Sequence, residues 1–320
     1  MLSRREFLSL GLGSGLAGVA GYTLGRHAAP VPAQRSGSAA PGAGYAHGIE
    51  PPTGIGPLGL DGRVHPPPRR RGLQELDLWV AEQPVEIARG TRMTAWTFNG
   101  TVPGPVLRAT EGDELNIRFR NLGARAHNLH FHGRHEVTAD GWEPVPPGGE
   151  ARYRFRAGPF GLHPYHCDTT PAAEHISHGL FGAFIVDPPG GRPPAHEIVL
   201  VLGGFDTDGD GQSDLYAWNG VAGYFARYPI KVPTGRLVRA YLINMVADQP
   251  LASFHLHAET FDIYRSGTRL VPDERSDVVT LAQGERAIVE FRLPARGRYM
   301  FHPHQRQMAE RGAMGWLAAI

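Results

Sequence analysis

Cysteine is almost absent from this chain of 320 residues, and the single cysteine is Cys167. One cysteine excludes an internal disulfide, so no covalent bridge holds the fold together. The net charge is only +1, which gives no electrostatic case for binding nucleic acid. After an apolar run near the N-terminus, no second apolar segment is long enough to cross a membrane. The lone thiol is therefore the most informative group that the sequence offers.

Helical periodicity is also lacking, whereas glycine and proline are frequent, with 42 and 28 residues. Short segments alternate apolar and polar side chains, which is typical of strands with one buried face: residues 115–120, 151–156 and 287–293. A segment rich in proline and glycine, residues 188–194, indicates a domain boundary. Each half then has the size of a β-sandwich. We therefore expect an all-β fold of two Greek-key β-sandwich domains, residues 73–190 and 191–320.

The N-terminus carries a targeting pattern. Arg4 and Arg5 precede an apolar, glycine-rich run, as in a Tat-type export signal. We expect this signal over residues 1–33, with cleavage near residues 31–33, and a flexible linker rich in proline, glycine and alanine over residues 34–72. An uncleaved anchor helix is the alternative, although the run is short for a span. The sequence thus predicts export to the periplasm or the cell exterior, with no stable membrane span once the signal is removed.

Histidines accompany the cysteine. Cys167 lies in the segment HPYHCD, residues 163–168, and His175 follows. Elsewhere the chain has three His-x-His pairs, which are His130/His132, His255/His257 and His302/His304. Imidazoles combined with a single thiolate are the ligand set of copper redox proteins. An exported protein with an unpaired cysteine agrees with this interpretation, and the sequence therefore predicts copper as the cofactor.

Strand geometry sorts these ligands, because successive side chains of a strand point to opposite faces. His130 and His132 therefore share one face, and His127 takes the other. Cys167 likewise points away from the face of its two sequence neighbours. We expect two sites back to back: His127 with Cys167 in one, and His130, His132 and His166 in the other, with Asp168 on the same face.

The thiolate site needs one more imidazole, which we assign to His175, with His178 as the competing choice. Two histidines and one cysteine with a weak or absent axial ligand form a type 1 copper site. Leu180, five residues past His175, takes the axial position and cannot ligate a metal. The loss of a thioether donor at that position should raise the reduction potential.

The histidines of the second half join those of the first in a larger site. Seven imidazoles aimed at one interface predict a copper cluster, made of His130, His132, His166, His255, His257, His302 and His304. His166 and Cys167 are sequence neighbours, so one peptide step joins the cluster to the thiolate site. We expect electrons to pass along Cys167 and His166, and Asp168 to assist as a proton relay.

The chain resembles the multicopper oxidases, specifically the two-domain bacterial type with type 1 copper in the first domain. The resemblance covers roughly residues 73–320 and rests on the stretches FNGTVPGP, HNLHFHG, YHCDTTPAAEHISHGLFGAFIVDP, SFHLHAETFDIY and MFHPHQRQMAERGAMGW. It implies cupredoxin-like domains, up to four coppers per chain, laccase-like oxidation of a small reducing substrate and reduction of dioxygen. It also implies that the thiolate site is type 1, that the seven histidines form a type 2/type 3 cluster, and that the chain forms a homotrimer. Asp168 stands where the family pattern has a further histidine.

Two other functions remain open at this point. The chain also resembles the copper nitrite reductases, which share the HNxxFH and YHC frames but have a catalytic aspartate at the position of His130. A non-catalytic blue copper electron carrier is the other alternative, although a carrier has no use for the histidine pairs of the second half.

A second metal pattern lies in the loop of residues 206–214. Its spacing, D-x-D-x-D-G, matches the start of a calcium loop and offers Asp206, Asp208, Asp210 and Asp214. Ala217 occupies the twelfth position, where such loops carry glutamate. The alternatives are a structural calcium ion and a simple acidic turn.

Overall fold

The computed structural model describes Ile55–Gly56 and residues 71–320. The expected export signal, residues 1–33, and all of the expected linker except residues 55–56 and 71–72 lie outside the described residues. Ile55–Gly56 forms a short strand, β1, that pairs antiparallel with β4 (Val106–Thr110), so the segment that we interpreted as a linker contributes to a sheet. In the part of the chain that the structure describes, no helix is long and apolar enough to cross a membrane.

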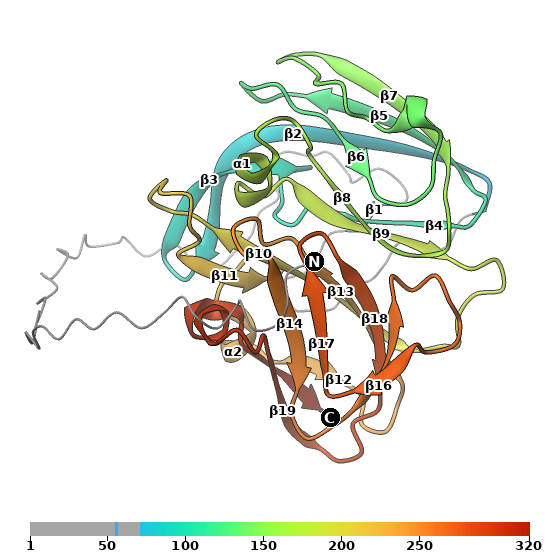
Figure 1. Cartoon of the computed structure of the whole chain (residues 1–320), viewed down its shortest axis with the longest axis vertical. Helices are drawn as coiled ribbons and strands as arrows, with labels where there is room; N and C mark the ends of the chain where they lie inside the picture. Colours follow the sequence, from blue (N-terminus) through green and yellow to red (C-terminus); the bar gives the residue numbers. More distant parts are fainter. Residues whose placement is uncertain (1–54, 57–70) are drawn as a thin grey trace, which may run out of the picture. The chain divides into compact units, whose positions relative to one another are not determined.

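The first half of the chain builds two sheets, with strand orders β1-β4-β9-β8-β6 and β3-β2-β5-β7 (Figure 1). Strand β2 is the longest and carries the second sheet, pairing antiparallel with β3 and parallel with β5. The further elements of this half are β2 (Leu73–Ala88), β3 (Thr91–Phe98), β5 (Glu114–Asn121), β6 (His130–Phe131), η1 (Val137–Ala139), β7 (Glu150–Arg156), β8 (Gly161–His166), α1 (Ala172–Ser177) and β9 (Phe181–Asp187).

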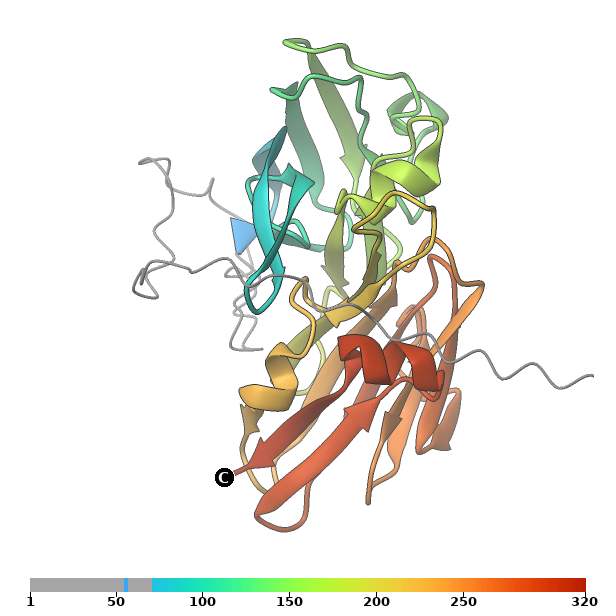
Figure 2. The same cartoon turned by 90° about the vertical axis from the view of Figure 1, so that its left-hand side faces the viewer.

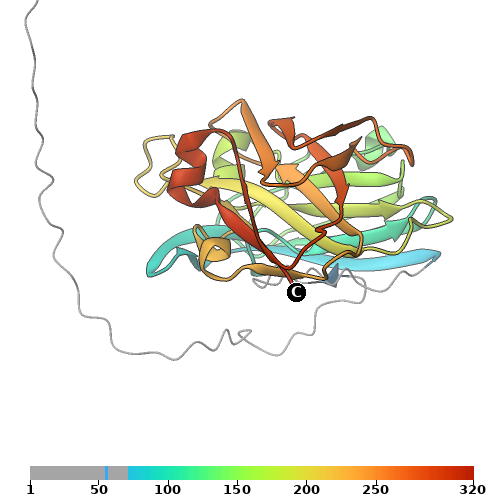
Figure 3. The ribbon, with the colours of Figure 1, turned by 90° about the horizontal axis from the view of Figure 1, so that it is seen from below.

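The second half repeats this plan with the sheets β11-β10-β13-β18-β15-β16 and β12-β20-β19-β14-β17, drawn in yellow to red in Figure 3. Short helices lie outside the strands in both halves (Figure 2). The elements are β10 (His196–Phe205), β11 (Leu215–Trp218), α2 (Tyr224–Arg227), β12 (Ile230–Val232), β13 (Val238–Asn244), β14 (Leu251–Leu256), β15 (Phe261–Arg265), β16 (Glu274–Ser276), β17 (Val278–Ala282), β18 (Arg286–Phe291), β19 (Gly297–His302), α3 (Arg306–Met308), η2 (Ala309–Ala313) and β20 (Gly315–Ala319).

Each half closes around its own apolar core. In β5 the apolar side chains at every second position, among them Leu115, Ile117 and Phe119, are fully buried, as the alternation predicted. The core of the first half also contains Cys167 and Leu180. The second half has a separate core around Trp218, Phe254 and Phe301. The prediction of an all-β fold of packed sheets is confirmed.

A buried charge network joins the two halves. Arg108 of β4 donates to Asp187 in its own half, with Nε 2.6 Å from Oδ2, and to Glu197 of β10, with Nη1 2.7 Å from Oε2. Glu197 also accepts from the hydroxyl of Tyr241 at 2.8 Å and from Arg239 at 3.2 Å. A third apolar core, with residues from both halves, lies at the same junction. The halves are therefore held by paired charges as well as by apolar packing.

Candidate metal centres

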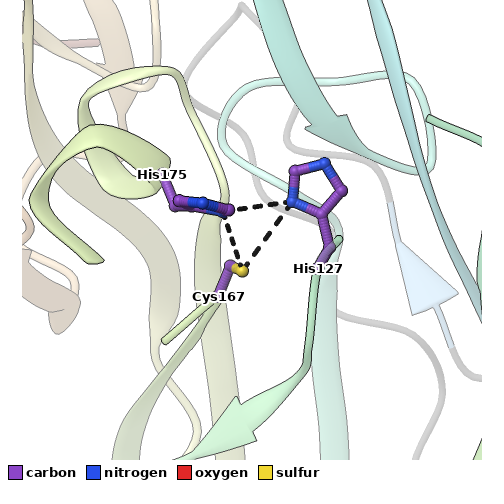
Figure 4. A group of neighbouring side chains, drawn as sticks. All are labelled: His127, Cys167 and His175. Atoms are coloured by element: carbon purple, nitrogen blue, oxygen red, sulfur yellow. Dashed lines mark hydrogen bonds between the residues drawn. The ribbon is translucent and has the colours of Figure 1, made fainter. Parts of the chain in front are cut away.

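Three side chains from separate elements meet in the first half of the chain (Figure 4). His127 precedes β6, Cys167 follows β8 directly, and His175 lies in α1. The Nδ1 atoms of His127 and His175 are 3.1 Å apart, and Cys167 Sγ lies 3.1 Å from His175 Nδ1 and 3.9 Å from His127 Nδ1. We call this group the thiolate site.

Burial controls the protonation of the thiolate site. Burial, followed by the charge of His175, lowers the pKa of His127 to about 4, and burial also lowers the pKa of His175. Both imidazoles are therefore neutral near pH 7, with lone pairs available. Burial raises the pKa of Cys167, which disfavours a bare thiolate, whereas a cation bound between these atoms favours it. One sulfur and two imidazole nitrogens converging in an apolar core fit a copper ion.

Backbone contacts fix the loop that carries these groups. The amide of Cys167 donates to the carbonyl of Leu180 at 3.0 Å, and the amide of Leu180 donates to the carbonyl of His175 at 3.2 Å. Leu180 is fully buried in the same core as Cys167. It thus lies between the two ligand-bearing segments and has no donor atom in its side chain.

The sequence alone did not identify two residues that lie beside the thiolate site. The amide of Asn128 donates to Cys167 Sγ at 3.4 Å, while its side-chain oxygen accepts from the amide of Asp168 at 2.6 Å. The ring of Trp96 packs edge-on against His127 and His175, with centroids 5.2 and 4.8 Å apart. Asn128 lies inside the HNLHFHG stretch, which could have drawn attention to it. Nothing in the sequence around Trp96 pointed to this role.

A trio of imidazoles, His130, His132 and His166, gathers where β6 and β8 pair. Strands β6 and β8 pair His130 with His166, and the Nε2 atoms of His132 and His166 are 3.1 Å apart. His130 Nδ1 lies 3.0 Å from the carbonyl of Asp140, and His166 Nδ1 lies 3.0 Å from that of Cys167. Because a carbonyl only accepts, both Nδ1 atoms carry hydrogen, and both Nε2 atoms keep a lone pair.

Electrostatics in this first trio also favour neutral imidazoles. Burial and the charge of His166 lower the pKa of His132 to about 3, and burial lowers the pKa of His166. Asp168 is not a member of the trio: its side chain is exposed, and the group of ligand atoms within 4.8 Å of one another comprises the three histidines alone. The carboxylate of Asp168 still acts on His166 through its charge, which raises the pKa of that imidazole against the effect of burial.

A second trio in the other half repeats this design with His255, His257 and His302. Strands β14 and β19 pair His255 with His302, and the Nε2 atoms of His257 and His302 are 3.0 Å apart. The Nδ1 atoms of His255 and His302 again face backbone carbonyls, at 2.7 and 2.8 Å. His304 lies beside the trio, with its ring centroid 4.7 Å from that of His255.

The two trios form separate groups within the described part of one chain. A cavity of about 460 Å³ opens beside the first trio and is lined by His130, Phe131, His132, Gly133, Arg134, His135, Val137, Asp140 and Arg286. No histidine of the second trio lines it. The seven imidazoles that were expected at one interface therefore divide into a set of three and a set of four.

The acidic loop after β10 brings together Asp206, Asp208 and Asp210, with ligand oxygens within 4.8 Å of one another. The carboxylate of Asp206 accepts hydrogen bonds from three backbone amides of the loop. Asp214 accepts instead from the amide and hydroxyl of Thr207. The loop is thus closed by its own hydrogen bonds, and Asp214 does not belong to the group of three.

Comparisons with known proteins agree with this architecture. Two models of the multicopper oxidase family match the chain, over residues 79–191 and 192–319. The chain therefore belongs to the multicopper oxidases, a family of copper oxidoreductases, and the suspected resemblance is confirmed.

Particular relatives include both oxidases and reductases. A crystal structure of a multicopper oxidase is 40% identical, with a TM-score of 0.78, and the match covers 83% of this chain and 98% of that one. The copper nitrite reductase structure from Nitrosomonas europaea is 28% identical, with a TM-score of 0.70 and coverage of 78% and 94%. The copper-containing nitrite reductase of Neisseria meningitidis serogroup A is 30% identical over 264 residues, which are 74% of this chain and 67% of that protein. The chain thus spans about two thirds of the length of these curated relatives.

Proposed function

We propose that the chain is an exported multicopper oxidase that takes electrons singly from a small reducing substrate and uses them to reduce dioxygen. The observation that carries this proposal is the junction of Cys167 and His166. Neighbours in sequence, they point into two different groups of ligands, the thiolate site and the first trio. The covalent path between the two groups is one peptide unit. An electron accepted by a copper ion at the thiolate site would therefore have a direct covalent route to the histidines of the first trio.

Copper would be held by His127, Cys167 and His175 at the thiolate site and by the histidine trios, where it would supply one-electron acceptance and dioxygen binding. The chain supplies the remaining functions. The Nδ1–H bonds to backbone carbonyls hold the trio imidazoles with their Nε2 lone pairs inward. Leu180, buried in the same core as Cys167, offers no donor atom to a metal held at the thiolate site, and exposed Asp168 can exchange protons with solvent close to His166.

The division of the imidazoles supports a homotrimer. Each chain has one trio in each half, and neither trio alone supplies the seven imidazoles of a type 2/type 3 cluster. We infer that the first trio of one subunit meets the second trio of another, in a head-to-tail interface that closes as a ring. Each chain then carries up to four coppers, and the acidic loop is the candidate for a structural calcium ion.

The domain assignment follows the same reasoning. We assign residues 1–33 to a Tat-type signal, 34–72 to a linker that includes the short strand β1, and 73–190 and 191–320 to the two cupredoxin-like domains. The protein would act in the periplasm or outside the cell.

The direct test measures copper per chain, the visible and EPR spectra, and oxygen uptake with a phenolic donor. We expect a thiolate-to-copper absorption band, copper well above one ion per chain, and oxygen consumption. A protein with about one copper per chain that consumes no oxygen would contradict the proposal and would instead support an electron carrier.

Nitrite reduction is the second candidate, because relatives named as copper nitrite reductases match at 28–30% identity. A single trio of imidazoles also suffices for one open copper site. This alternative predicts two coppers per chain and nitrite consumption in the absence of oxygen. The imidazole of His130, where those enzymes have an aspartate, favours the oxidase.

A further inference from the structure

The thiolate site has no ligand that a donor could touch freely. His127 and Cys167 are 0% exposed and His175 is 4% exposed. Trp96 covers both imidazoles with its indole edge, at interplanar angles of 67° and 76°, and is itself only 4% exposed. An electron donor in solution must therefore act through the groups that cover the site.

Two planar groups, from His178 and Arg125, pack on the indole of Trp96. The imidazole of His178 stacks on it, with centroids 4.3 Å apart and planes inclined by 21°. The guanidinium carbon of Arg125 lies 5.1 Å from the centre of the indole. Two hydrogen bonds hold the stack: the amide of Trp96 donates to the carbonyl of His178 at 2.9 Å, and His178 Nδ1 donates to the carbonyl of Glu174 at 2.8 Å.

We propose that Trp96, His178 and Arg125 form the donor surface of the protein, through which electrons reach the thiolate site. His178 is partly exposed, and the side chain of Arg125 is 60% exposed, so both can meet a substrate directly. Trp96 acts behind them as a positioning residue, because its ring contacts both imidazole ligands. This inference rests on the proposed function, since it presupposes a redox copper at the thiolate site.

The chemistry of the donor surface selects the substrate class. An imidazole and a guanidinium present planar faces that stack on an electron-rich aromatic ring. Oε1 of Glu174 lies 3.9 Å from Nη1 of Arg125 and offsets its charge, so the surface has little net charge to attract a strongly charged donor. We therefore expect a small neutral phenol. Such a phenol would give one electron to a copper(II) ion held at the thiolate site, which would become copper(I), and would release its hydroxyl proton to solvent water, leaving a phenoxyl radical. The indole gains and loses no atom.

The test compares four variants of the copper-loaded protein: His178→Ala, Trp96→Leu, Trp96→Phe and, as a matched control, Trp142→Leu. Trp142 is 69% exposed and outside the stack. Anaerobic bleaching of the thiolate-to-copper band by a methoxyphenol gives the reduction rate. We expect His178→Ala to raise the KM for the phenol about threefold, as for the loss of one exposed stacking contact. Trp96→Leu should lower the rate at saturating phenol several-fold, and Trp96→Phe should restore most of it.

A second readout does not depend on turnover. The fluorine NMR line of 4-fluorobenzyl alcohol, a neutral aromatic probe, should broaden on the copper-loaded wild type and on Trp142→Leu. It should broaden much less on His178→Ala, because the probe loses its place near the paramagnetic ion. Unchanged broadening and phenol kinetics in His178→Ala, or a slower reaction in Trp142→Leu alone, would overturn the donor surface.

The failure of this inference is distinct from the failure of the proposed function. If the wild type shows no thiolate-to-copper band and no bleaching, the redox assignment itself is wrong. If the band, its reduction potential and its bleaching by phenol are normal in every variant, only the donor surface is wrong. If Trp96→Leu also shifts the reduction potential of the thiolate site, a slower rate in that variant has two causes. The result for His178→Ala then decides.

Discussion

Substitution of Glu197 is the strongest test of how the two halves of the chain are held together. The Glu197 side chain is 16% exposed and accepts from Arg108, Arg239 and Tyr241. Burial alone would raise the pKa of Glu197, but the hydrogen bond and charge of Arg108, with help from Tyr241 and Arg239, outweigh burial and lower the pKa to about 2. The glutamine variant, Glu197→Gln, keeps the shape of the side chain and removes its charge, leaving both guanidiniums with one anionic partner fewer.

The magnitude follows from the pKa. A lowering from the model-compound value of 4.5 to about 2 corresponds to about 3 kcal/mol of folding free energy. A folded-state pKa below the unfolded one stabilises the fold above pH 4.5, and this contribution disappears as the pH falls toward 2. We therefore expect Glu197→Gln to lose about 3 kcal/mol at pH 7, in line with the cost of breaking a buried ion pair. The loss should shrink steadily below pH 4.5.

Urea denaturation followed by tryptophan fluorescence, at pH 7 and at several values down to pH 3, measures the effect. The control is Glu114→Gln, which breaks the exposed pair with Arg154 and should leave the midpoint nearly unchanged. A loss in Glu197→Gln below about 1 kcal/mol, or one that does not depend on pH, would refute the argument that these charges hold the halves together.

Three further predictions concern the metal centres and the core. Cys167→Ser should abolish the thiolate-to-copper absorption and leave the trios able to bind copper; retention of the band would show that the sulfur is not a ligand. His257→Ala should keep that band but lower oxygen uptake and copper content, because it removes one of the two imidazoles that face each other at 3.0 Å; normal uptake would exclude the second trio from the reaction. Gly182→Ala should cost about 1–3 kcal/mol of unfolding free energy, because the added methyl would meet the buried ring of Tyr165. Thermal denaturation measures this cost, and an unchanged midpoint would mean that Tyr165 moves without strain.

The strand alternation made much of the first half predictable. Side chains alternate along the two short segments that hold His130 and His166, so the sequence predicted which histidines share a face and which face Cys167 takes. The pairing of His130 with His166 in β6 and β8 is a finding of the structure. For the second half the sequence predicted only that His255, His257, His302 and His304 belong to the cluster, and the structure groups three of them, with β14 and β19 pairing His255 with His302. The alternation of faces is a good guide for these histidines because they lie in strands or directly next to them.

The alternation of faces does not decide whether a residue beyond the end of a strand joins a site. Asp168 follows β8 by two residues, and its amide bonds to the side chain of Asn128, so its carboxylate is exposed and is not in the trio. Trp96 could not be found from sequence either, because its contact with His175 joins β3 to α1 across residues that are distant in the chain. Such contacts depend on how the loops pack, which a local pattern does not determine.

The thiolate site and the two trios differ in how many of their candidate ligands one chain supplies, and this difference bears on subunit assembly. All three candidate ligands of the thiolate site come from the first half of one chain and meet in its core. Each trio offers only three imidazoles on a partly exposed surface, which we expect to bind copper less tightly than a closed site does. Under the proposed trimer, copper should therefore fill the thiolate site of isolated subunits first, and the trios should fill only when subunits meet. The blue chromophore would then form independently of oligomerisation, whereas oxygen reduction would require it.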